Sequence, residues 1–152
     1  MSSTVITNAW IKKVADALQS DTYDLGVAYF RIGEGGWSDA TGAKVARVPD
    51  PTLTDLDSIV NPSRYPADSR WTYQKAIVSA KITEVTVMSV KVECLVDSSE
   101  ANLDSSGFSP EFWELGIYDG DGTMISYTTF SRQPKDDTVA LRHYITIAIS
   151  RP

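Results

Sequence analysis

The residues whose types and spacing could perform chemistry begin with two aspartates in the run Asp119-Gly120-Asp121-Gly122. This run is similar to the start of a calcium-binding loop. Such a loop, if it began at Asp119, would need a carboxylate at its fifth position and a bidentate glutamate at its twelfth. The chain has Thr123 and Phe130 there. The run therefore predicts a tight turn and no metal site.

A second candidate is the glycine-rich run Gly33-Glu34-Gly35-Gly36, which follows a stretch with strand character. Glycine clusters in this position can cradle phosphate groups when a Lys-Ser or Lys-Thr pair opens a helix after them. No such pair follows here, and no helix is indicated. We interpret the run as a flexible turn.

The chain has one histidine, His143, and one cysteine, Cys94. A serine hydrolase needs a nucleophile, a base and an orienting acid, and only His143 could be the base. No Gly-x-Ser-x-Gly sequence is present. One cysteine and one histidine are too few for a structural zinc site and allow no disulfide within the chain. Alternating apolar residues place both side chains on buried strand faces, so we expect a packed or rim histidine and an inert core thiol.

Acidic residues are plentiful, but no spacing singles out a pair that could flank a glycosidic bond. Glu114 is exceptional because it lies inside a strand pattern between apolar residues. A carboxylate in that position must be neutralised or hydrogen-bonded, so we expect a basic group or backbone amides beside it. We interpret Glu114 as structural, and we expect no catalytic residue, no metal and no cofactor.

The composition is that of a soluble globular protein. The chain has 152 residues, of which 42% are hydrophobic and 22% charged, with a net charge of −6. This length predicts a single domain, residues 1–152, with a core of its own. The acidic balance disfavours duplex nucleic acid and anionic membranes as partners. The first residues lack a basic n-region, and no apolar run approaches the ~20 residues of a membrane span, so we expect assembly in a cytoplasm.

The hairpin predicted for residues 112–130 is the element around which the rest is organised. Trp113, Leu115 and Ile117 alternate with Glu114, Gly116 and Tyr118, which predicts a strand with these two faces. The Asp-Gly run then reverses the chain. Residues 124–130 return as a second strand, rich in β-branched and aromatic residues.

One substantial helix is predicted for residues 7–19, capped by Thr7 or Asn8. Its apolar stripe predicts core packing, with a surface for a partner helix as the alternative, and it consists of Trp10, Ile11, Val14, Ala15 and Leu18. Lys12, Lys13, Asp16 and Gln19 are expected to face away. Residues 24–32 follow as a strand.

Residues 37–70 are a long segment without clear periodicity, interrupted by four prolines. Such a connection is uncommon in a compact domain. Three explanations stay open: an excursion that packs on another chain, a flexible flap, or short elements, among them a helical turn within 53–60. Trp37, Tyr65 and Trp71 lie in or beside the segment, and they either form an interface or cover the protein's own core. If the segment is a docking excursion, its deletion should leave a folded domain.

The remaining chain is rich in strand patterns. Residues 72–82 and 86–96 are predicted strands, because the apolar face switches by one residue near Val87 and one regular strand cannot accommodate that. We expect a turn near Thr83-Glu84 or, alternatively, a bulge near Val87. A helix start is indicated at 97–100, a polar loop at 132–138 and a last strand at 139–149. The predicted fold class is α+β and mostly β: an N-terminal helix packed on an antiparallel β-sheet or small sandwich, with a long irregular loop.

Two stretches together resemble the N-terminal, baseplate-attaching domain of the phage tail-collar fibre family. The first is Ile6-Thr7-Asn8-Ala9, followed by Phe30-Arg31-Ile32-Gly33-Glu34-Gly35; the second is the run from Trp113 to Gly122 with its return strand. The order helix, strand, long loop, two strands, hairpin and final strand is also similar. The resemblance implies that Gly33, Gly35, Glu114, Gly116, Asp119 and Gly122 hold the shape of the domain.

The resemblance also implies a function. It indicates a non-enzymatic virion component of the tail, a baseplate-to-fibre adaptor or tail fibre base, with baseplate and tail fibre proteins as partners. It implies a homo-oligomer such as a trimer, or repeated copies around the tail, with assembly in the bacterial host cytoplasm. Family members normally head a longer fibre, so the end of this chain at Pro152 indicates either a truncated fibre or a stand-alone adaptor.

A different class of function stays open beside this one. A small β-domain that binds carbohydrate or protein could use Trp37, Tyr65 and Trp71 to stack on sugar rings. An enzyme is the least supported class.

Overall fold

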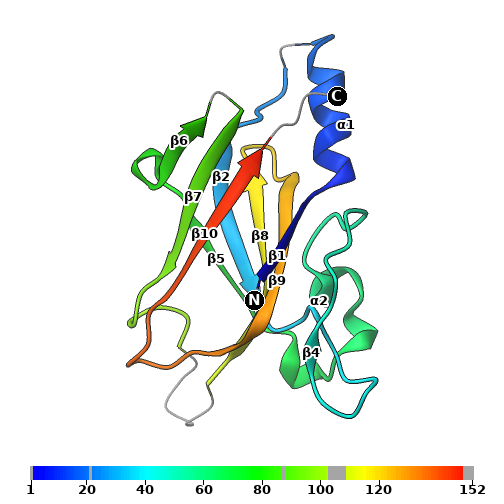
Figure 1. Ribbon diagram of the computed structural model, residues 1–152, viewed down its shortest axis with the longest axis vertical. Coiled ribbons are helices and arrows are strands. Elements are labelled where there is room, and N and C mark those ends of the chain that lie inside the picture. The colour runs from blue at the N-terminus through cyan, green and yellow to red at the C-terminus, as the bar shows by residue number, and fades with distance from the viewer. Residues whose placement is uncertain (1, 21, 87, 103–108, 149–152) are drawn as a thin grey trace.

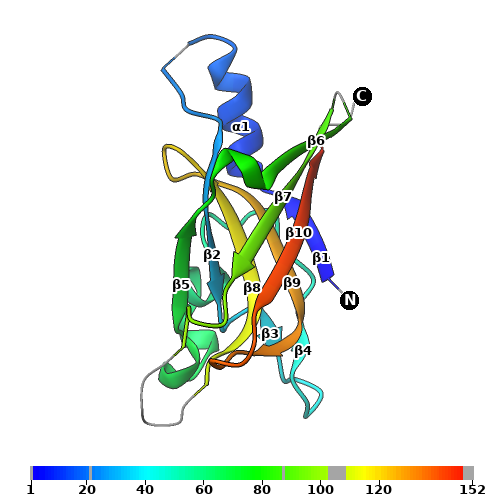
Figure 2. The same ribbon diagram turned by 90° about the vertical axis from the view of Figure 1, so that its left-hand side faces the viewer.

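The computed structural model describes residues 2–20, 22–86, 88–102 and 109–148, and it consists mainly of two antiparallel sheets packed face to face (Figures 1 and 2). The first sheet has the order β1 (Ser2–Ile6), β9 (Met124–Pro134), β8 (Glu111–Asp119), β2 (Val27–Gly33) and β5 (Thr72–Ala76). The second has the order β10 (Leu141–Ala148), β7 (Ser89–Val96) and β6 (Ile82–Thr86). The predicted fold class, α+β and mostly β, is confirmed.

The main core lies between the two sheets. Strands β2 and β8 contribute Phe30, Ile32, Leu115 and Ile117, and the strands of the second sheet contribute side chains such as Val92, Cys94, Val96, Ile145 and Ile147. All of these side chains are buried. The period-two alternation of the strands places these residues on the inner faces, as a sandwich requires.

The central hairpin is confirmed as β8 and β9. Between them Asp119 accepts the Gly122 N–H at 3.0 Å, and Gly122 has a φ of +87°, a conformation that glycine adopts readily. One part of the predicted pattern is wrong. The β8–β9 register shifts between Phe112 and Glu114, so Phe112 joins Leu115 and Ile117 in the main core, while Trp113 packs with Trp37 and Tyr65. Strand β9 also extends to Pro134, into the predicted polar loop.

The predicted helix is confirmed as α1 (Asn8–Ala17), and the Thr7 hydroxyl accepts the Trp10 N–H at 3.2 Å as its cap. The predicted division of its faces is partly wrong. Trp10 is buried and Val14 is half-buried against the main core, but Ile11 and Leu18 are exposed and Lys13 is buried. The reason is that α1 extends beyond the sheets, so only one side of its first turns meets the core (Figure 2).

The strand predicted for residues 72–82 is wrong. Strand β5 ends at Ala76 in the first sheet, a 3₁₀ turn spans Ser79–Lys81, and β6 begins at Ile82 in the second sheet. Thr83 and Glu84 therefore lie within β6, which pairs with β7 with a register shift between Glu84 and Thr86. The alternative of a bulge near Val87 falls on a residue outside the described ranges. The alternation in the sequence is not followed by the structure across this connection, since Ile77 is buried and Val78 is exposed.

Of the remaining predictions, those for the last strand, His143 and Cys94 agree with the structure, and the one for a helix after Asp97 does not within the described residues. The last strand is confirmed as β10, except that Ile149 lies outside the described residues. The His143 ring packs on the Phe130 ring, with 4.4 Å between the ring centroids, and its Nε2 atom forms a hydrogen bond with Gln133 Oε1 at 2.8 Å. Cys94 is buried, and burial raises the pKa of its thiol to about 12. No helix follows Asp97 within the described residues 97–102. None of the described helices has the length and apolar character needed to cross a bilayer.

A polar cluster joins the two sheets at one end. Glu100, after β7, accepts hydrogen bonds from Lys75 at 2.6 Å and Tyr73 at 2.7 Å, both on β5. Its side chain also accepts the Asp97 N–H at 3.0 Å. Partial burial opposes ionisation, but these hydrogen bonds outweigh it and lower the pKa of Glu100 to about 2.

This cluster predicts an acid-sensitive contribution to stability. The folded pKa lies below the ordinary value of 4.5, so Glu100 stabilises the fold fully above about pH 4.5 and loses this effect as the pH falls toward 2. We expect Glu100→Gln to lower the free energy of unfolding at pH 7 and to flatten its decline between pH 4.5 and 2. Urea unfolding at several pH values measures this, with Glu84→Gln on the exposed part of β6 as control. Equal pH dependence of the wild type and Glu100→Gln would contradict this account.

Candidate functional site

The most extensive polar site surrounds Glu114, which lies in the middle of β8 and is fully buried. Its carboxylate accepts the backbone N–H groups of Asp57 at 2.8 Å and Ser58 at 3.3 Å, which begin the short helix α2 (Asp57–Val60). The hydroxyls of Ser58 and Tyr127 donate to it as well, each at 2.7 Å. The expectation that Glu114 meets a basic group or backbone amides is confirmed for the amides.

Glycines make the room that this carboxylate needs. A Cβ atom on Gly33 would lie 2.9 Å from Glu114 Oε1, and one on Gly35 would lie 2.7 Å from the same atom and 2.9 Å from the Ser58 backbone nitrogen. Gly36 has a φ of +87°. The run that we expected to be a flexible turn is thus a buried wall of the Glu114 site. Its second residue, Glu34, is buried too and accepts the N–H groups of Trp71 and Glu111.

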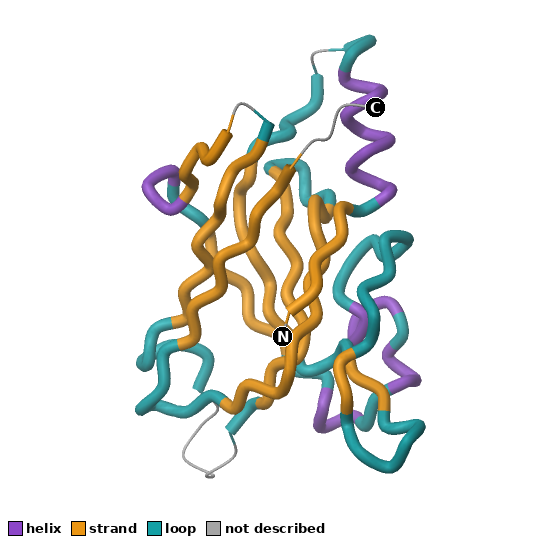
Figure 3. The backbone as a smooth tube through the Cα atoms, viewed as in Figure 1, coloured by secondary structure: helices purple, strands orange, loops and turns teal. Residues whose placement is uncertain are grey.

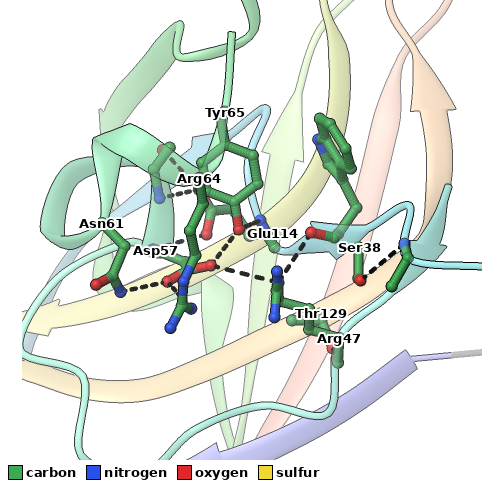
Figure 4. Close-up of polar contacts among 12 residues, drawn as sticks. Ser38, Arg47, Asp57, Asn61, Arg64, Tyr65, Glu114 and Thr129 are labelled. Atoms are coloured by element: carbon green, nitrogen blue, oxygen red, sulfur yellow. Dashed lines mark hydrogen bonds and ion pairs between the residues drawn. The ribbon is translucent and has the colours of Figure 1, made fainter.

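A second carboxylate, Asp57, lies beside Glu114 (Figure 4). It accepts hydrogen bonds from the Tyr65 hydroxyl, from Asn61 at 2.6 Å and from Arg64 at 3.0 Å, and Arg47 lies 3.9 Å away. A cavity of about 330 Å³ opens beside it, lined by Arg47, Val48, Asp50, Leu53, Asp57, Arg64 and Tyr127. Both oxygens of Asp57 are therefore occupied by groups of the protein itself.

The electrostatics of the site follow from burial. Burial raises the pKa of Glu114, and the donated hydrogen bonds oppose that rise by stabilising the carboxylate. Burial also raises the pKa of Tyr65 and Tyr127 far above the ordinary value. The carboxylates of Asp57 and Glu114, to which their hydroxyls donate, raise it further. The tyrosines are thus held as neutral hydrogen-bond donors. This arrangement fixes segments to one another, and it leaves the carboxylates saturated.

The segment 37–70 is built of short elements, which confirms one of the three explanations (Figure 3). They are β3 (Trp37–Ser38), β4 (Val45–Ala46), α2, and 3₁₀ turns at Pro62–Arg64 and Ala67–Ser69. They pack on the face of the first sheet that points away from the second, where Leu53 and Leu56 meet Tyr118, Met124 and Tyr127. On the same face Arg31 contacts both oxygens of Asp55 at 2.8 Å.

This packing corrects the expected interface residues. Trp37 and Tyr65 are only 4% and 3% exposed, because they pack against Trp113 and Ala46 inside the protein. Neither ring can stack on a sugar or contact another chain while so buried. Trp71 is half-buried against Tyr73 and Phe112. This packing argues against the expectation that deletion of residues 37–70 leaves a folded domain, because deletion would leave Glu114 buried without its amides.

The other end of β8 carries a second buried carboxylate, Asp119. It pairs with Lys13 of α1 at 2.6 Å and accepts the N–H groups of Asp121 and Thr123, each at 3.0 Å. Lys13 also reaches Asp121 at 2.8 Å. Where the sequence is similar to a calcium loop, a lysine thus lies between the aspartates. Within the described ranges no group of three or more His, Cys, Asp or Glu is placed to hold a metal ion.

The two remaining glycines of the resemblance also lie at tight places. A Cβ atom on Gly116 would lie 2.9 Å from the Tyr118 hydroxyl and 2.8 Å from the Met124 sulfur. Gly122 supplies the positive φ of the β8–β9 turn. Gly33, Gly35 and Glu114 meet in one site, whereas Gly116, Asp119 and Gly122 lie further along the hairpin.

Sequence reasoning missed several residues of these sites, above all Asp57, Ser58, Tyr127 and Lys13. Lys13 could have been found, because it lies three residues after Trp10 and therefore on the same side of the helix. Asp57 and Ser58 carry no such signal, because their partner is 56 or 57 residues away in the sequence. Tyr127 lies within the predicted return strand, but nothing in the sequence pattern pairs it with Glu114.

An apolar groove of about 420 Å³ lies beside α1. It is lined by Trp10, Leu25, Val27, Glu84, Thr86, Met88, Ser89, Val90, Ile125 and Ile147. Leu18 and Ile11 on α1 are 87% and 54% exposed, and Val85 and Met88 are exposed near the β6–β7 reversal. This end of the protein therefore presents several apolar side chains to solvent.

Comparisons of the chain with models of protein families, with curated proteins and with solved structures find no match.

The contacts of Glu114 predict that replacing one of its carboxylate oxygens strongly lowers the stability of the fold. Glu114→Gln replaces an acceptor oxygen by an NH₂ group that faces other donors, so we expect it to lower the free energy of unfolding by about 2–5 kcal/mol. Glu111→Gln is the matched control, because Glu111 lies on the same strand but pairs at the surface with Arg132. We expect that control to leave stability almost unchanged. Denaturant unfolding measures both variants, and equal stability of the two would refute the assigned role of Glu114.

Proposed function

We propose that this protein is a non-enzymatic structural component of a phage or phage-like tail, either a baseplate-to-fibre adaptor or the base of a tail fibre. The observation that carries the proposal is the contact between the two stretches that resemble the phage tail-collar fibre family. Residues 33–35 of the first stretch and Glu114 of the second pack directly on each other. Three of the residues that the resemblance depends on, Gly33, Gly35 and Glu114, thus share a physical role, which is to form the buried site.

The state of the polar groups supports a scaffold role. Glu114, Asp57 and Asp119 accept hydrogen bonds or ion pairs from groups of the chain itself. Glu114 and Asp119 each link two segments that are distant in sequence, whereas Asp57 holds together parts of the segment 37–70. Buried polar groups that are fully hydrogen-bonded in this way make a local structure rigid. The alternative of a carbohydrate-binding domain has lost two of its three proposed aromatic residues to burial.

We further propose α1 and its apolar groove as the surface that docks on a partner tail protein. The helix extends beyond the sheets (Figure 2) and presents Ile11 and Leu18 to solvent. Exposed apolar residues beside an apolar groove are typical of a protein–protein contact. The segment 37–70 contributes mainly to the protein's own core in this account, so it is the less favoured docking surface.

Mass spectrometry of tail particles purified from the source tests the proposal. We expect the chain to be present in a fixed ratio to sheath and baseplate proteins, in multiples of three or six per tail, because symmetric assemblies repeat their contacts. Absence from particles, with soluble chain left in the lysate, would contradict the proposed function.

Variants of the chain test the docking surface separately. Leu18→Asp should reduce the number of copies per particle, because it places a charge in the apolar contact. Val48→Asp on the segment 37–70 is the matched control, since Val48 is 91% and Leu18 87% exposed. Incorporation of Leu18→Asp at the wild-type level would overturn α1 as the docking surface while leaving the tail function intact.

A further inference from the structure

Strand β10 presents a long free edge. Among the strands that the structure describes, it pairs only with β7, in an unbroken antiparallel register from Leu141↔Val96 to Ala148↔Ser89. An edge strand has one row of backbone N–H and C=O groups without strand partners, and this row can pair with another chain. Figure 2 shows β10 at the border of its sheet, on the same side of the sandwich as β1.

The β10 edge lacks the features by which proteins usually block such pairing. It has no proline, lysine or bulge, and Arg142 is its one charged residue. The other edge of the same sheet, β6, has five residues, carries Glu84 and has a register shift after it. In the first sheet, β1 and β5 also have five residues, and β5 carries Lys75. With eight residues, β10 is thus the longest and most regular of the described edges.

The strand is complementary to itself in the antiparallel direction. Leu141, Ile145 and Ile147 are buried, and His143 is half-buried, whereas Arg142, Tyr144, Thr146 and Ala148 are on the outer face or less covered. Residues directly opposite each other in an antiparallel pair project to the same face. A two-fold axis at Tyr144 therefore matches Leu141 with Ile147, His143 with Ile145, and Arg142 with Thr146.

The charges and rings also favour this pairing. Arg142 would face a threonine, so no like charges meet, and it keeps its contact with Glu93 of its own chain at 3.1 Å. Tyr144 is 54% exposed, and in the pair it would lie opposite Tyr144 of the second copy. Aromatic cross-strand pairs are among the favourable ones.

We propose that β10 is an interface for a second copy of this chain, which adds its own β10 antiparallel and makes one six-stranded sheet from two three-stranded ones. The contact is isologous, because the same edge serves both copies. The inference does not depend on the tail function.

The test uses charges placed on the two-fold axis. Tyr144→Lys and Tyr144→Glu each bring like charges together, so we expect each variant alone to dimerise at least about fivefold more weakly than wild type. An equimolar mixture should form a heterodimer, because lysine then faces glutamate. Sedimentation velocity measures the dimer fraction across the micromolar range, and native mass spectrometry identifies the heterodimer by its mass.

Two controls keep the result specific. Tyr144→Phe retains the ring and should dimerise as wild type does. Val85→Lys adds a charge to the exposed part of β6, the opposite edge of the sheet, and should not affect the dimer. Far-UV circular dichroism confirms that each variant is folded. The proposal is overturned if the wild type is monomeric, if Tyr144→Lys dimerises as well as wild type, or if the mixture forms no heterodimer.

Discussion

A buried carboxylate in the middle of a strand is the constraint on which the rest of this structure depends. An ionised side chain removed from water costs several kcal/mol unless donors surround it. Glu114 meets this requirement with two amides and two hydroxyls, and none of the four donors lies on its own strand. The buried position of Glu114 therefore depends on α2 docked on one face of the sheet and on β9 beside β8.

The same logic is repeated at the end of β8. Asp119 is buried and draws Lys13 of α1 onto the hairpin turn. One strand thus carries two buried acids, of which one fixes the irregular segment 37–70 and the other fixes the N-terminal helix. The parts of the protein that belong to neither main sheet are both attached to β8. The buried carboxylate of Glu114 also explains the glycines at positions 33 and 35, because a Cβ atom at either position would collide with it.

Sequence patterns predicted the elements with strong local periodicity. The hairpin, the N-terminal helix and the last strand were found because their apolar residues recur at the spacing of one element. Trp113 was misplaced because the irregularity between Phe112 and Glu114 changes the face of a residue without any mark in the composition. The strand predicted for 72–82 failed because apolar and polar residues go on alternating in the sequence where the chain passes from one sheet to the other. The kind of partner that Glu114 needs followed from its surroundings, but Asp57 and Ser58 could not be named, since the segment that holds them has no periodicity.

These features describe a rigid scaffold in which a segment that looks irregular in sequence is part of the core. Amide hydrogen exchange of the native protein tests that claim most directly, because exchange reports the free energy needed to expose each amide. The account predicts that the amides of Asp57 and Ser58 exchange as slowly as those of β8 and β9, through opening of the whole fold. Exchange of these two amides at the rate of an exposed loop, with β8 and β9 still protected, would show that Glu114 does not hold the segment and would contradict the account.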